Sequence, residues 1–136
     1  MLISGGYGRR GVTVSYAGKH QLRIAFSSSL VLAAQLDGNR VIMDWQPIDN
    51  QLIFIFTADG VYHGYSTFSL HPDGGTSVNS RAVHVNRKPF SFLQPGKYEA
   101  TIGTDADGHT TITITLPAQG EAHAQHERPD ASEEAA

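Results

Sequence analysis

The feature that most constrains the fold of this chain is an internal similarity between two stretches of sequence. Residues 38–56 and residues 96–116 each begin with glycine and continue as a strand, a polar turn and a second strand. A repeat of this size cannot bury its own apolar face, so we expect the two copies to pack against each other around one core. The sequence therefore predicts an α+β, mostly β fold, in which two similar strand-rich halves form a small barrel or sandwich with one short helix.

Residue patterning sets the expected elements. Three serines at 27–29 offer N-caps to a helix over residues 30–36, and Gly38 suits the positive φ at a helix end. In the second half, two prolines within residues 87–95 allow at most one helical turn. Alternating or continuous apolar residues predict strands at 11–16, 21–26, 41–45, 52–56, 81–86, 97–103 and 109–116. Residues 61–70, rich in tyrosine and phenylalanine, are expected to be extended.

Composition divides the chain into three parts. Residues 1–10 are rich in glycine and arginine and are expected to be a flexible basic arm. Residues 11–117 are expected to be a single β-rich domain, with degenerate repeats at 19–56 and 81–116. Residues 118–136 have too little apolar content to fold and predict a disordered acidic tail.

Hydropathy argues against membrane insertion and export. The longest apolar run spans residues 30–34, far below the roughly 20 residues that cross a bilayer. The first residues also lack the apolar core of a signal peptide. We therefore expect a cytoplasmic protein with no membrane partner.

Charge is unevenly distributed along the chain. The formal net charge is −3, but residues 121–136 contribute five acidic side chains against one arginine. The first 36 residues contain four lysines and arginines and no acidic residue. The N-terminal third is therefore locally basic, although a domain whose total charge is near neutral is a poor match for strong binding to a polyanion.

Sequence motifs give no catalytic residue, metal site or cofactor, and we predict that the protein is not an enzyme. The chain has no cysteine, which excludes thiol nucleophiles and cysteine-bound zinc. Its seven histidines show neither His-Glu-x-x-His nor His-x-His spacing. Asp105 and Asp107 resemble one edge of a calcium loop, but the glutamate that ends such a loop is absent, so a plain Asp-Gly turn is favoured.

Residues 19–56 resemble the swapped-hairpin module of bacterial regulators of the AbrB and MraZ type. The resemblance rests on Lys19, Arg23 and Ile24 in the first strand and on Gly38–Val41 after the helix. It implies a homodimeric, DNA-binding transcription regulator, with residues 81–116 as a looser second copy. Together, the arm and the resemblance give these candidate contacts to duplex DNA: Arg9, Arg10, Lys19, Arg23, Arg40, Arg81, Arg87 and Lys97.

Two other functions stay open. The first is a protein-binding accessory factor of phage or plasmid type that inhibits or assembles with a protein partner. The second is a structural component of a larger particle. A strand that is apolar on both faces and an aromatic stretch after it would form the protein interface, and both features favour a homo-oligomer. The interface candidates are Leu52, Phe54, Phe56, Tyr62, Tyr65 and Phe68.

Overall fold

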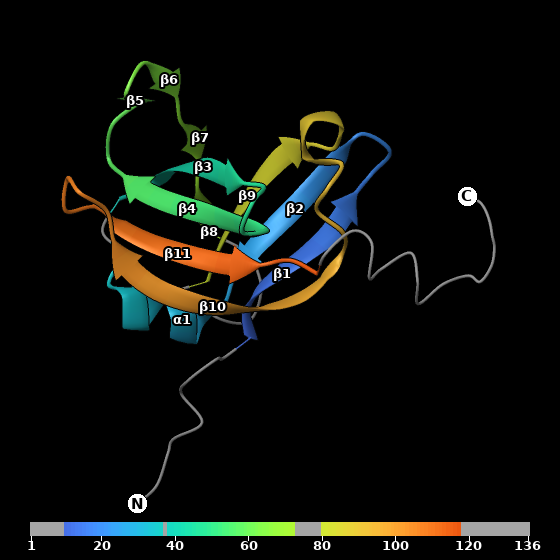
Figure 1. Cartoon of the computed structure of the whole chain (residues 1–136), viewed down its shortest axis with the longest axis horizontal. Coiled ribbons are helices and arrows are strands. Elements are labelled where there is room, and N and C mark those ends of the chain that lie inside the picture. The colour runs from blue at the N-terminus through green and yellow to red at the C-terminus, as the bar shows by residue number, and fades with distance from the viewer. Residues whose placement is uncertain (1–9, 37, 73–79, 118–136) are drawn as a thin grey trace, which may run out of the picture.

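The computed structural model describes residues 10–36, 38–72 and 80–117. The expected arm and tail lie outside these residues, apart from Arg10 at the start of β1. The described chain forms one antiparallel sheet that curls into a nearly closed barrel with one short α-helix (Figure 1). This confirms the predicted mostly β fold. In sheet order the strands are β7 (Phe68–Ser69), β3 (Arg40–Gln46), β4 (Gln51–Thr57), β11 (Thr110–Thr115), β10 (Gly96–Thr104), β1 (Arg10–Ala17), β2 (Gln21–Phe26), β9 (Arg81–Asn86) and β8 (His71–Pro72).

One short segment covers both edges of this sheet. β7 pairs with β3 at one edge, and β8 pairs with β9 at the other. Only Leu70 separates β7 from β8 in the chain. Its backbone N–H donates to the carbonyl of Asn39 over 2.8 Å, and its side chain is buried. Residues 68–72 therefore bridge one end of the gap between β3 and β9, where they pair with residues 40–41 and 81–82.

The two halves of the barrel share an order of elements. Each contains a strand, a helical segment and a hairpin: β2, α1 (Ser28–Ala34) and β3–β4 in the first half, then β9, the 3₁₀ turn η1 (Lys88–Phe90) and β10–β11 in the second. The halves meet at two antiparallel seams. β4 pairs with β11, with Ile53 opposite Thr113, and β2 pairs with β9, with Ile24 opposite Val83.

The core follows from the alternation of each strand. Inward-facing residues such as Ile24, Phe54 and Ile114 are fully buried. The Phe26 ring, on β2, meets the rings of Phe54 and Phe56 on β4 edge-on, with centroids 5.1 and 5.3 Å apart. These contacts cross the barrel interior and join its two walls into one hydrophobic core.

Helix α1 begins as predicted, but its end differs from the prediction. The Ser27 hydroxyl accepts the Leu30 N–H over 3.2 Å, and Gln35, not Gly38, adopts the left-handed conformation at the C-cap, with φ of 54°. Gly38 is required for another reason, because a Cβ atom there would lie 2.6 Å from the carbonyl carbon of Thr57. Within the described ranges, no helix has the length and apolar character needed to span a membrane.

The stretch over residues 61–70, predicted to be extended, contains three short strands and folds back on itself. His63 and Gly64 both have positive φ, at 50° and 84°. Such a pair gives the two-residue turn that suits a tight hairpin. The strands on either side are β5 (Val61–Tyr62) and β6 (Tyr65–Ser66), and the β5–β6 hairpin projects from the barrel beyond β4 (Figure 1).

Candidate functional site

Charge on the described residues is segregated between two parts of the barrel. β1, β2 and β9 are consecutive in the sheet. The ranges that contain them, 10–36 and 80–98, include lysines and arginines but no acidic residue. The acidic residues described in the structure lie on β3, on β10 or in the turns beside β3, β4 and β10. One wall of the barrel is therefore positive although the whole chain carries a small negative charge.

Arg23 lies on the outer face of this positive wall. On β2 it alternates with Leu22 and Ile24, which point into the core. In the strand register it stands opposite His84 on β9 and Ser15 on β1. Cross-strand neighbours on one face are close enough to interact. A polar, basic row therefore crosses the three strands.

A second group of cations, around Arg87, lies at the end of this wall. Its guanidinium stacks on the Tyr16 ring, 3.8 Å from the centroid. It also donates hydrogen bonds to the backbone carbonyls of Gln21, over 3.3 Å, and Gly18. Two exposed lysines adjoin the residues of this contact in the sequence: Lys19 follows Gly18, and Lys88 follows Arg87. Lys88 was missed by the sequence-based prediction, although it directly follows Arg87. We call Lys19, Arg23, Arg87 and Lys88 the basic wall.

The other candidate DNA contacts are separate from the four residues of the basic wall, although Arg81 lies on β9 and Lys97 lies on β10, the neighbour of β1. The Arg40 guanidinium donates to the hydroxyl and carbonyl oxygens of Thr67, both over 2.6 Å, and thereby ties the segment before β7 to β3. Arg81 is at the opposite end of β9 from Arg87, where it lines a hollow with Gly38. Lys97 is exposed on β10, opposite Thr13 of β1. Arg9 lies outside the described residues, and for Arg10 only the backbone, at the start of β1, is described.

The six interface candidates do not form one surface. Leu52, Phe54 and Phe56 point into the barrel and are at most 3% exposed, so they are core residues in this fold. The inner face of β4, on which they lie, is covered by the rest of the barrel. An apolar inner face of this strand is therefore explained by the core and does not indicate an interface. Phe68 packs against the same core. Only Tyr62 and Tyr65, on the β5–β6 hairpin, lie outside it.

A cluster of polar side chains attaches the β5–β6 hairpin to the turn between β10 and β11. The Tyr62 hydroxyl donates to a carboxylate oxygen of Asp105 and lies 3.4 Å from Asp107 Oδ2. His63 Nε2 lies 2.9 Å from the same Asp107 oxygen. No local sequence pattern predicts these contacts because they join residues more than 40 positions apart. We call this group, with His109, the hairpin clasp.

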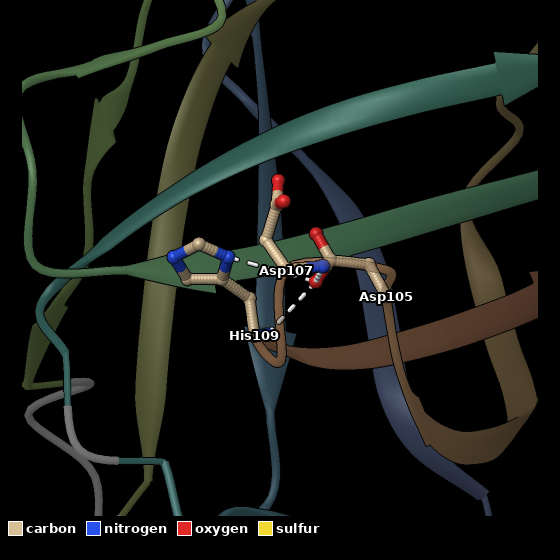
Figure 2. A group of neighbouring side chains, drawn as sticks. All are labelled: Asp105, Asp107 and His109. Carbon is tan, nitrogen blue, oxygen red and sulfur yellow. Dashed lines mark hydrogen bonds and ion pairs between the residues drawn. The ribbon is translucent and has the colours of Figure 1, made fainter.

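Asp105 organises the turn on which the clasp is built. Its Oδ1 atom accepts the backbone N–H groups of Asp107 and His109 over 3.0 and 2.8 Å (Figure 2). Burial alone would raise the pKa of Asp105, but the hydrogen bonds from Tyr62 and these two amides outweigh it, so the pKa lies below its usual value. The same bond to Asp105, together with burial, raises the pKa of the Tyr62 hydroxyl. The clasp therefore pairs an ionised carboxylate with a neutral phenol.

A shallow cavity of about 290 Å³ lies beside the clasp, on the outer face of β3 and β4. Ile42 and Ile55 contribute apolar surface to it, and Tyr62 and Tyr65 contribute aromatic surface. Asp44 adds the one carboxylate among the residues that line it. The surface of the cavity is thus mainly apolar and aromatic.

The chain matches no protein family, no curated protein and no solved structure. The resemblance to regulators of the AbrB and MraZ type therefore stays a prediction.

Proposed function

We propose that the protein is a small DNA-binding regulator that holds duplex DNA against the basic wall. The observation that carries this proposal is the segregation of charge: Lys19, Arg23, Arg87 and Lys88 lie on or beside three neighbouring strands whose described residues include no carboxylate. Lysine and arginine side chains that neutralise phosphates provide most of the affinity of non-specific DNA binding.

The shape of the wall suits a phosphate backbone. Its outward residues beside the cations are short, among them Thr13, Ser15 and Ala17 on β1. The Arg87 guanidinium is already held by Tyr16 and two carbonyls, so little side-chain entropy is lost when it meets a phosphate. Such contacts position a protein on DNA without reading sequence. Specificity would then come from groove shape or from the arm that carries Arg9 and Arg10, and a homodimer would present two basic walls to one duplex.

Fluorescence anisotropy with a random duplex, at a series of salt concentrations, tests this proposal. Four phosphate contacts predict that log affinity falls against log salt with a slope of about −3.6. The variant Lys19→Gln/Lys88→Gln should bind more weakly, with a slope of about −1.8, because it removes two of the four cations.

A matched control separates local contacts from net charge. Ile48→Glu/Thr115→Glu changes the net charge by the same amount, at exposed positions on the β3–β4 turn and on β11. This control should keep the wild-type slope. Absence of binding at low salt, or an equal loss of affinity in both variants, would refute the basic wall as the DNA site.

A second candidate function is protein binding through the β5–β6 hairpin. Val61 and Tyr65 are 59% and 69% exposed on this projecting element. Exposed aromatic residues are typical anchors of protein interfaces. If this is the function, the variant Val61→Ser/Tyr65→Ser should no longer bind the protein partner, whereas its affinity for duplex DNA, measured by fluorescence anisotropy, should be unchanged.

A further inference from the structure

One nitrogen of the hairpin clasp has no hydrogen-bond partner. The Nδ1 atom of His109 has less than 1 Å² of exposed surface and no partner among the residues that the structure describes. It lies 3.6 Å from Asp105 Oδ1, which is too long for a hydrogen bond. Burial of an unpaired polar atom is costly, so such an atom calls for an explanation. When the ring proton is on Nε2, Nδ1 holds a lone pair that can bind a cation.

Other ligand atoms surround this nitrogen. One atom from each of Asp105, Asp107 and His109 can be chosen so that all lie within 4.8 Å of one another. Figure 2 shows these three side chains on the same turn, with the His109 imidazole beside the Asp105 carboxylate. The three residues occupy alternate positions of the chain, and the tight turn that Asp105 caps brings them together. His63 Nε2, from the turn of the β5–β6 hairpin, lies 2.9 Å from Asp107 Oδ2.

We propose that the hairpin clasp binds a divalent transition-metal cation, with Asp105, Asp107 and His109 as ligands. Imidazole nitrogen together with carboxylate oxygen suits zinc and its first-row neighbours. Calcium is a poorer fit because it takes oxygen ligands. This site is separate from the basic wall, and the proposal does not depend on DNA binding.

The surrounding contacts fit this role. The amides of Asp107 and His109 and the Tyr62 hydroxyl hold the Asp105 carboxylate in place. Hydrogen bonds of this kind orient the ligands of metal sites. An ionised carboxylate has more acceptor positions than these three bonds use, so it can also bind a metal.

Isothermal titration calorimetry of the full chain with zinc chloride tests the proposal. Because His123 and His126 could bind zinc independently, all proteins compared carry His123→Ala/His126→Ala. The reference protein should bind one zinc ion saturably at micromolar concentrations. Asp107→Asn and His109→Gln should each weaken binding at least about 10-fold.

Asp107→Asn is the more informative variant, since the Asp107 side chain contacts Tyr62 and His63 and, within the described turn, forms no hydrogen bond with the backbone. Circular dichroism should show that it keeps the wild-type fold. The control Asp44→Asn removes an exposed carboxylate outside the clasp and should bind zinc like the reference. In NMR spectra, the ring signals of His63 and His109 should shift with zinc, while those of His84 should not. No saturable binding, or equal binding by the Asp107→Asn variant, would overturn the proposal.

Discussion

Truncation of Phe26 tests whether the two walls of the barrel share one core. The side chain is 0% exposed, and its ring meets those of Phe54 and Phe56 across the interior. Deleting a buried phenylalanine ring costs about 3–5 kcal/mol, because apolar burial is lost and a cavity remains. Each of the two edge-on ring contacts accounts for about 0.5–1.5 kcal/mol of this. Since a domain is stable by only about 5–15 kcal/mol, Phe26→Ala should leave a marginal fold.

Urea denaturation can measure this loss, with Trp45 fluorescence as the probe. Trp45 is the only tryptophan and stacks on Phe92 with ring centroids 4.1 Å apart, so its emission should change on unfolding. If Phe26→Ala does not fold, Phe26→Leu should still give a measurable cost of about 1.5 kcal/mol. Ile48→Ala is the control, because Ile48 is 95% exposed and its loss should cost less than about 0.5 kcal/mol. A cost below about 1 kcal/mol for Phe26→Ala would refute a shared, closely packed interior.

Three further predictions follow from single contacts. Gly38→Ala should destabilise the protein by at least about 2 kcal/mol in urea denaturation because its Cβ would meet the Thr57 backbone, whereas Gly60→Ala, with open space around it, should be nearly neutral. Ser27→Ala removes the N-cap of α1 and should cost about 1 kcal/mol; Ser27→Gly should cost only a few tenths, and equal costs would contradict a capping role. Tyr62→Phe, measured with chelator present, should cost about 1 kcal/mol at pH 7. The pKa of Asp105, which accepts the Tyr62 hydrogen bond, is lowered in the folded protein, so the ionised carboxylate stabilises the fold above about pH 3.8 and this stabilisation is lost when Asp105 is protonated. The cost of Tyr62→Phe should therefore shrink as the pH falls below about 3.8. A cost that does not vary with pH would exclude an ionised acceptor.

The sequence was sufficient to predict the strands of the barrel because their patterns are local. Alternation in residues 21–26 and 81–86 marks β2 and β9 at the residues where the structure has them. The β10–β11 turn was likewise visible in Asp105 and Gly108, which supply its acceptor and its positive φ. These features can be predicted because the backbone conformation of a turn, and the alternation of buried and exposed side chains along a strand, depend on residues that are close in the sequence.

Features that depend on distant residues were not visible. The stretch from Val61 to Leu70 is rich in tyrosine and phenylalanine, so its composition favours an extended chain. The structure breaks it at His63–Gly64, and the sequence carries no sign that Tyr62 will reach Asp105. The same limit explains the assignment of Phe54 to an interface, because two apolar faces show that a strand is covered twice but not what covers it.

The small net charge of the chain is compatible with DNA binding because of where its charges lie. Opposite walls of a β structure are separated by about 10 Å of packed side chains. The Debye length at physiological salt is about 8 Å, so a phosphate at the basic wall is largely screened from any carboxylate that lies farther away than this. The attraction therefore depends on the local cluster around Arg87. By the same reasoning, neutralising Asp44 should change DNA affinity much less than neutralising Lys88, although each substitution changes the net charge by one.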